Sequence, residues 1–264
     1  MNPVIYIRAS LAEEEEKQAA ARHFPIVERR TAIPSGSLVI PRYAALPFNE
    51  ELEADVQALG SQLINTHAEH VYVANLRNWY YHLVDFTPRT WFALDQIPDE
   101  GPFVLKGATN SKKHQWSTHM FARDKREAIG VFTRLAADGY VGHQPIYVRQ
   151  YVPLRKLCDP VSPQAGPVCE EYRFFVLDGQ VLASGFYWSN YQDDIEEEMD
   201  PGAVPEDFLR AVICRVEPHI RFWVVDVART EAGDWIVVEL NDGQQSGLSA
   251  VDPEDLYRAL RATL

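Results

Sequence analysis

The most informative stretch of this sequence runs Phe222-Trp-Val-Val-Asp-Val-Ala-Arg-Thr-Glu-Ala-Gly-Asp-Trp-Ile-Val-Val-Glu-Leu-Asn241. Two apolar, β-branched runs flank a polar, turn-like segment, and this pattern predicts a β-hairpin. If the turn is centred on Ala232-Gly233, Asp226 and Glu239 lie directly opposite each other, with their Cβ atoms roughly 5 Å apart. Asn241 follows two residues after Glu239 and therefore projects from the same face of the strand.

Two carboxylates that face each other on an apolar strand pair repel unless something neutralises them. A set of oxygen ligands suits a hard cation such as Mg²⁺, so we predict that Asp226, Glu239 and Asn241 bind Mg²⁺. Removal of one carboxylate is then expected to maintain or raise the stability of the metal-free protein. The alternative is a solvent-facing polar stripe, with the strand register displaced by one residue.

The composition bounds the class of protein. A chain of 264 residues can bury a sizeable core, as one large domain or as two to three subdomains. The net charge of −13 argues against broad nucleic-acid or anionic-membrane surfaces. The first apolar stretch is too short for a signal peptide, and no apolar run approaches the roughly 20 residues of a membrane span. Three cysteines without a Cys-x-x-Cys motif imply neither disulfides nor a thiolate zinc site, so we expect a reduced, cytoplasmic protein.

The first ~90 residues alternate between predicted strands and helices, which indicates a parallel sheet covered on both faces. Strands are expected at Val4–Arg8, Ser37–Pro41 and Gln62–Asn65, and helices at Leu11–His23, at Glu50–Leu59 and from Thr66 to about Trp79. The Pro-rich crossing around Phe86–Arg89 and Ile97–Pro102 is a plausible domain boundary.

Downstream of this crossing the pattern changes to strands with hairpin turns. Strands are expected at Phe103–Gly107, Ile146–Val152, Glu171–Leu177 and Gln180–Tyr187, and helices at Asp124–Asp138, Glu206–Val216 and Asp252–Ala262. Asp178-Gly179 is a strong signal for a two-residue hairpin. The segment Pro153–Pro167 shows no periodicity, and the acidic stretch Asp193–Asp200 is expected to be a solvated loop or a helix start.

Two cations stand out in this region. Lys106 ends an apolar strand, where its ammonium either holds a phosphate as a point charge or simply reaches the solvent. Arg173 lies within the apolar run Tyr172-Arg-Phe-Phe-Val176, where an unpaired guanidinium would be costly, so it must meet an internal carboxylate or a ligand anion. The Gly-x4-Gly-Lys phosphate loop, the dinucleotide fingerprint and the Gly-x-Ser-x-Gly elbow are all missing from the sequence.

The order of these features resembles the ATP-grasp superfamily of carboxylate-amine and related ligases. The resemblance runs from about Thr87 to Ser249 and comprises a strand with Lys106 and a polar loop, a hinge strand, a Glu-x-Arg hairpin and an Asp…Glu-x-Asn hairpin. More narrowly, the chain resembles the clade that is named for two arginines and one lysine. The resemblance implies an α/β protein in which two α+β subdomains grip a nucleotide and follow an α/β parallel-sheet domain.

The resemblance also implies a role for each matching residue. For the nucleotide, Lys106 would bind the phosphates, Glu171 the ribose, and Gln150, Tyr151 and Val152 the adenine. Arg173 would stabilise the acyl-phosphate intermediate, and Arg77 would be the clade's first arginine. Mg²⁺ would be held by Asp226, Glu239 and Asn241. The loop after Lys106 lacks the family's usual glycines, and Lys112 or Lys113 is expected to replace their contacts with charge.

The resulting prediction is an ATP- and Mg²⁺-dependent ligase that releases ADP and acts on a small-molecule or peptide carboxylate and an amine acceptor. We expect domains at residues 1–90, 91–152 and 153–264, with substrate contacts from Arg42 and Asn65 at strand ends. One alternative is a non-catalytic nucleotide-binding protein. Another is an adenylating nucleic-acid ligase, but that chemistry requires a lysine followed closely by Asp-Gly, which Lys106-Gly-Ala-Thr109 lacks.

Overall fold

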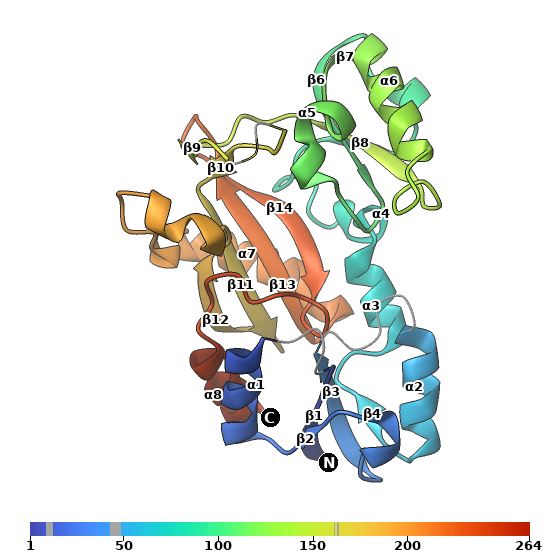
Figure 1. Ribbon diagram of the computed structural model, residues 1–264, viewed down its shortest axis with the longest axis vertical. Coiled ribbons are helices and arrows are strands. Elements are labelled where there is room, and N and C mark those ends of the chain that lie inside the picture. Colours follow the sequence, from blue (N-terminus) through green and yellow to red (C-terminus); the bar gives the residue numbers. More distant parts are fainter. Residues whose placement is uncertain (9–12, 43–48, 161, 163) are drawn as a thin grey trace.

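Three four-stranded sheets form the framework of the chain. The computed structural model describes residues 1–8, 13–42, 49–160, 162 and 164–264. In Figure 1 the sheet of β1–β4 lies at the bottom, the sheet of β11–β14 in the middle and the sheet of β5–β8 at the top. Within the described ranges, no helix is both long and apolar enough to cross a membrane.

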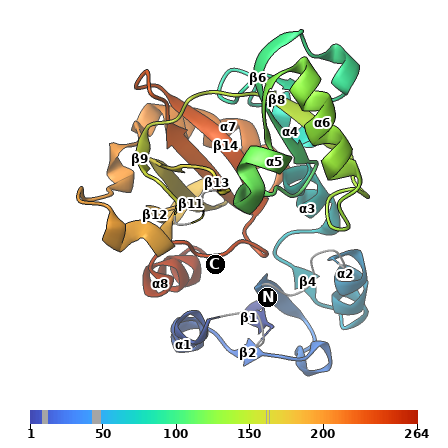
Figure 2. The same cartoon turned by 45° about the horizontal axis from the view of Figure 1, so that its top comes forward.

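The amino-terminal sheet is parallel, with the strand order β2-β1-β3-β4. Its elements are β1 (Asn2–Ile7), α1 (Glu14–His23), β2 (Ile26–Val27), β3 (Ser37–Arg42), α2 (Asn49–Ala58) and β4 (Gln62–Leu63). Alternate residues of β1 face opposite ways: Ile5 and Ile7 pack with α1, whereas Val4 and Tyr6 pack with α2. Figure 2 shows these two helices on opposite sides of the sheet. The predicted parallel sheet is thus confirmed, while the predicted start of the first helix at Leu11 lies outside the described residues.

The predicted helix from Thr66 to Trp79 is instead two helices, α3 (His67–Ala74) and α4 (Leu76–Tyr80). Thr66 caps α3 in a capping box with Glu69. Asn75 has an extended backbone, and its side chain accepts a hydrogen bond from the Arg77 amide, so it ends one helix and caps the next.

The small sheet is antiparallel, in the order β5-β8-β6-β7, and is covered by α6. Its elements are β5 (Thr90–Trp91), β6 (Glu100–Gly107), α5 (Trp116–His119), β7 (Phe121–Asp124), α6 (Lys125–Ala136) and β8 (Ile146–Gln150). Asp124 caps α6 by accepting a hydrogen bond from the Glu127 amide at 2.8 Å.

The large sheet is also antiparallel, in the order β12-β11-β13-β14. Its elements are β11 (Glu171–Leu177), β12 (Gln180–Phe186), α7 (Glu206–Val216), β13 (Phe222–Arg229), β14 (Trp235–Asp242) and α8 (Pro253–Thr263). Asp178 and Gly179 have φ angles of 46° and 78°, as the predicted Asp-Gly hairpin requires. In the described part of the aperiodic segment, β9 (Lys156–Cys158) pairs antiparallel with β10 (Val168–Cys169), which follows the segment directly. The predicted domain limits at residues 90 and 152 remain predictions.

A β-bulge sets the register of the β13–β14 hairpin. Near the turn, Arg229 pairs with Trp235 and Val227 with Val237, so the predicted turn centre is displaced. The register then shifts between Asp226 and Val227, which leaves Val238 as the extra residue of β14. Beyond the bulge, Asp226 pairs with Glu239, as the sequence predicted.

Candidate active site

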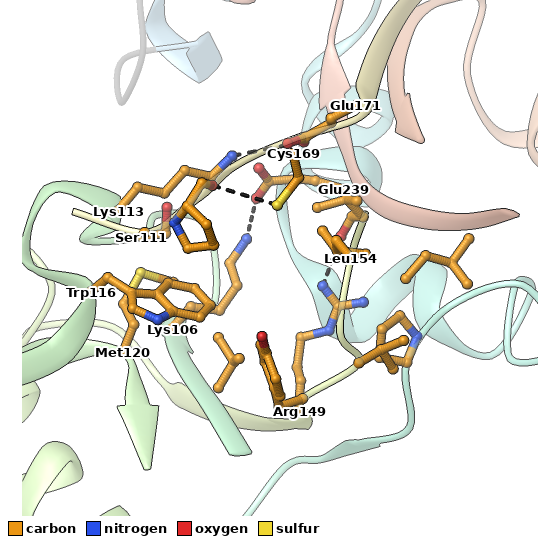
Figure 3. A pocket seen from close by; sticks show the side chains of 18 of the residues that line it. Lys106, Ser111, Lys113, Trp116, Met120, Arg149, Leu154, Cys169, Glu171 and Glu239 are labelled. Atoms are coloured by element: carbon orange, nitrogen blue, oxygen red, sulfur yellow. Dashed lines mark hydrogen bonds and ion pairs between the residues drawn. The ribbon is translucent and has the colours of Figure 1, made fainter. Parts of the chain in front are cut away.

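A cavity lies between the small and the large sheet. Together with the open solvent at its mouth, it measures about 940 Å³. Figure 3 shows Lys106 and Lys113 reaching across it towards Glu239 and Glu171. The cavity is lined by Pro88, Val104, Lys106, Ser111, Lys113, Trp116, Met120, Arg149, Gln150, Tyr151, Val152, Leu154, Gly166, Pro167, Cys169, Glu171, Trp188, Ile236, Val238 and Glu239.

Lys106 and Glu239 form an ion pair across the cavity, with Lys106 Nζ donating to Glu239 Oε1. Lys106 comes from β6 of the small sheet and Glu239 from β14 of the large sheet, so the pair joins the two walls. Burial opposes ionisation of Glu239, but Lys106 and Lys113 hold the pKa of its carboxyl at about 2. Glu239 is therefore a carboxylate across the whole physiological pH range.

Asp226 and Arg173 form a second ion pair one strand further into the large sheet. Arg173 Nε and Nη2 donate to Asp226 Oδ1 and Oδ2, each at 2.8 Å, and Nη1 donates to Gly247 O at 2.6 Å. Asn241 Nδ2 also reaches Asp226 Oδ2, at 3.3 Å. The internal carboxylate that Arg173 was predicted to need is thus Asp226, which is completely buried.

Glu171 and Lys113 occupy the cavity wall beside these pairs. Lys113 Nζ lies 3.9 Å from Glu171 Oε1 and donates to the Tyr187 hydroxyl at 2.7 Å. Glu171 Oε1 is buried and accepts no hydrogen bond from the described residues. Burial raises the pKa of the Glu171 carboxyl to about 7, although Lys113 opposes the shift. A buried acceptor without a donor suits a ligand hydroxyl group.

The predicted adenine-binding residues form one edge of the cavity. The amides of Gln150 and Tyr151 donate to the backbone carbonyls of Arg89 and Pro102, at 2.8 and 3.0 Å, which fixes the hinge in an extended conformation. The surrounding wall is largely apolar, with aliphatic side chains and the Trp116 ring. An apolar wall of this kind is consistent with a nucleotide base.

Arg173, Asp226 and Asn241 lie next to lining residues but do not themselves line the cavity. Four other predicted functional residues do not line it either, namely Arg77, Lys112, Arg42 and Asn65. Arg77 is exposed, and its guanidinium lies 5.3 Å from the centre of the Phe92 ring. Lys112 pairs with Asp138 at 2.8 Å, so Lys113 and not Lys112 is the loop lysine at the cavity. Arg42 and Asn65 also lie elsewhere.

Arg42 and Asn65 hold the amino-terminal domain against the large sheet. Arg42 is completely buried, pairs with Glu16 at 2.7 Å and donates to the carbonyls of Gly243 and Ser246. Asn65 Nδ2 donates to Asp242 Oδ1 at 2.8 Å, and its Oδ1 accepts from the Phe222 amide. These contacts support a structural role and not the expected substrate contacts.

Sequence reasoning missed two residues of the site. Tyr187 pairs with Glu171 through the hairpin, since its amide donates to Glu171 O at 2.9 Å, so the hairpin register offered a signal for it. Arg149 lies on β8 directly before the hinge, is 7% exposed and lines the cavity. An arginine inside the apolar strand Ile146–Gln150 was its signal.

The predicted Mg²⁺ ligands share one face of the β13–β14 pair. Among the described residues, no group of three histidine, cysteine or acidic side chains could hold a metal ion. Asp226, Glu239 and Asn241 nevertheless offer two carboxylates and one carboxamide oxygen at paired or neighbouring positions. Hard oxygen donors of this kind fit Mg²⁺, which commonly keeps several waters and takes only one or two protein carboxylates. Both carboxylates are also bonded to protein cations.

Residues 93–260 match the family model for an ATP-grasp domain of family 3 in the clade that is named for two arginines and one lysine. The chain belongs to this family. The match includes every strand of the two sheets around the cavity except β5, and it confirms the resemblance and the ATP-grasp fold that the sequence predicted. No curated protein matches the sequence of this ATP-grasp protein.

Solved structures share the fold of the ATP-grasp protein over nearly its whole length. A RimK domain ATP-grasp protein from Sphaerobacter thermophilus is 16% identical, with a TM-score of 0.56, and the match covers 97% of this chain and 98% of that one. The ATP-grasp ligase PsnB with a minimal precursor is 14% identical, with a TM-score of 0.59 and coverages of 99% and 98%. D-alanine–D-alanine ligase from Bacillus anthracis with ATP is 14% identical, with a TM-score of 0.56 and coverages of 97% and 90%.

Proposed function

We propose that this ATP-grasp protein is an ATP- and Mg²⁺-dependent ligase that joins a carboxylate to an amine or a similar nucleophile and releases ADP and phosphate. The observation that carries the proposal is the meeting of Lys106, Lys113, Glu171 and Glu239 in one cavity between the two sheets. Membership of the ATP-grasp family supports the same reaction class.

The proposed reaction has two steps. A substrate carboxylate oxygen attacks the γ-phosphorus of ATP, the bond to the leaving oxygen breaks, and an acyl phosphate and ADP result. An amine nitrogen then attacks the acyl carbon, loses a proton, and phosphate leaves. In phosphoryl transfer the protein's contribution is mainly positioning and neutralisation of charge.

The residues of the cavity and of the neighbouring Arg173–Asp226 pair divide this work by position. Lys106 and Lys113 bind phosphate oxygens, Glu171 accepts a hydrogen bond from a ribose hydroxyl, and Arg173 stabilises charge that develops during transfer. Mg²⁺, when held by Asp226, Glu239 and Asn241, would supply further neutralisation of phosphate charge. The apolar hinge edge around Tyr151 receives the base and excludes water.

The substrates are proposed at the level of class. The PsnB structure is a complex with a minimal precursor, and the D-alanine–D-alanine ligase structure is a complex with ATP. We extend from these relatives only a small-molecule or peptide carboxylate and an amine acceptor. The cytoplasmic location likewise remains a prediction.

The test is a turnover assay with panels of carboxylates, peptides and amines, in which nucleotides are separated by chromatography. ADP and phosphate in equal amounts are expected, dependent on Mg²⁺, with Glu239→Gln as the inactive control. AMP and pyrophosphate would refute the acyl-phosphate mechanism, and an AMP adduct on the protein would support an adenylating ligase. Tight ATP binding without turnover across the panels would favour a non-catalytic nucleotide-binding protein.

A further inference from the structure

Arg149 is the cation of the cavity to which the sequence assigned no function. It lies on β8, one residue before the hinge, and shares the cavity wall with Lys106 and Glu239. Figure 3 shows its side chain rising into the same space as these two residues. With only 7% of its surface exposed, the charge of Arg149 is poorly solvated by bulk water.

Two of the three guanidinium nitrogens of Arg149 are anchored by the protein. Nη1 donates to Val238 O at 2.7 Å, and Nη2 donates to Thr87 Oγ1 at 2.6 Å. Val238 is the extra residue of the β-bulge, whose backbone leaves the regular ladder. The bulge that brings Asp226 opposite Glu239 therefore also supplies the carbonyl that fixes Arg149.

The third nitrogen, Nε, is buried and has no hydrogen-bond partner among the described residues. An unsatisfied buried donor on a charged group is costly, and the cost is recovered if a ligand acceptor reaches it. Arg149 also has no carboxylate bonded to it, since both of its partners are neutral oxygens. Its charge and its unpartnered donor are thus available to an anion in the cavity.

We propose that Arg149 binds a phosphate group of the nucleotide through its Nε–H. This role is the one that the sequence assigned to Arg77, which lies exposed beside Phe92. The inference rests on the proposed ATP-dependent function and adds a specific phosphate ligand to it. A phosphate is favoured over the base because Arg149 stands with Lys106 and Lys113 around Glu239, where positive charge gathers.

Calorimetric binding of ATP and of adenosine to the full-length protein tests this inference. Arg149→Gln is expected to lower ATP affinity roughly 10- to 100-fold, the effect of losing a charged hydrogen bond, and to leave adenosine affinity unchanged. Arg149→Lys keeps the charge and should retain much of the ATP affinity that Arg149→Gln loses. Should Arg149→Gln fail to fold, Arg149→Lys decides, because lysine lacks the Nε–H of the guanidinium: a lower ATP affinity with unchanged adenosine affinity supports the inference, and unchanged affinity for both ligands overturns it.

Two further variants separate binding from structure. Thr87→Val removes the Nη2 anchor and should lower the melting temperature with a much smaller loss of ATP affinity than Arg149→Gln. Arg77→Gln is the rival arm, and a larger ATP loss there than in Arg149→Gln would overturn the inference. An Arg149→Gln protein that melts earlier but binds ATP normally would also overturn it, as would equal losses for ATP and adenosine. If the unmodified protein bound no ATP, the proposed function itself would fail.

Discussion

The stability of the ligand-free protein should depend strongly on Asp226. The facing carboxylates alone predict that Asp226→Asn relieves repulsion and stabilises the protein. The structure reverses this sign, because Arg173 is 8% exposed and Asp226 completely buried, and the two share two hydrogen bonds of 2.8 Å. Removing one partner of such a pair leaves the other buried charge unpaired, which costs about 3–5 kcal/mol. We therefore expect Asp226→Asn to lower the free energy of unfolding by about this amount.

A matched control lies at one end of the same sheet. Asp178 and Arg221 form an ion pair of similar two-pronged geometry, at 2.9 and 2.7 Å, but both side chains are more than 40% exposed. Exposed pairs of this kind contribute about 0–1 kcal/mol, and asparagine tolerates the left-handed backbone at this position. Asp178→Asn should thus change stability little.

Glu239→Gln should fall between these two variants. Its partner Lys106 is also buried, but burial lowers the pKa of the Lys106 ammonium, so that this lysine can lose its proton when Glu239 is removed. The expected cost is about 1–3 kcal/mol, that of one unsatisfied buried group. Urea unfolding in the presence of a chelator measures all three variants. An Asp226→Asn protein as stable as Asp178→Asn, or more stable than the unmodified protein, would refute this reasoning.

Two further predictions concern ligand binding and pH. Lys106→Ala should weaken ATP binding by about 1.5–3 kcal/mol. Arg173→Lys should lower single-turnover ADP formation more than ATP affinity, because lysine keeps the charge but loses the planar guanidinium. Equal losses of turnover and affinity in Arg173→Lys would contradict the catalytic role of Arg173. Burial raises the pKa of Glu171 to about 7, so its contribution to stability is complete below about pH 4 and is lost as the pH rises through 7. Relative to Glu171→Gln, the unmodified protein should lose about 3 kcal/mol of unfolding free energy across this pH range. A difference in unfolding free energy between the two proteins that stays constant with pH in urea unfolding would contradict the raised pKa of Glu171.

The fold was predictable where a pattern is local. Alternating strands and helices gave the parallel sheet, and Asp178-Gly179 gave the β11–β12 turn. The break at Asn75 was not predictable from periodicity, because the Leu76 amide at the start of α4 bonds to Ala108 O at the end of β6. The bulge at Val238 likewise depends on a distant partner, Arg149. Both features arise from contacts between segments that are far apart in the sequence.

The same difference between local patterns and contacts between distant segments decides which residues of the candidate site were predictable. Five candidate residues lie on strands that the sequence predicts, and alternation along a strand then gives the face to which each side chain projects. They are Lys106, Glu171, Arg173, Asp226 and Glu239. Lys113 could not be told from Lys112, since both lie in an irregular segment before α5. Arg149 could not be preferred to Arg77, since only the packing of β8 against β14 puts it in the cavity.

The charges around the cavity explain why the ligand-free site is stable and yet suited to an anion. The charged side chains of the site, within the described part of the chain, are Lys106, Lys113, Arg149, Arg173, Glu171, Asp226 and Glu239. Asp226 and Glu239 each have a cation bonded to them, so the repulsion inferred from sequence is already neutralised. Arg149 has no bonded carboxylate, and Glu171 is only half ionised near neutral pH because its pKa is about 7. The cavity therefore carries excess positive charge in a protein whose net charge is −13. That excess favours a polyanionic ligand such as ATP over a neutral or cationic one.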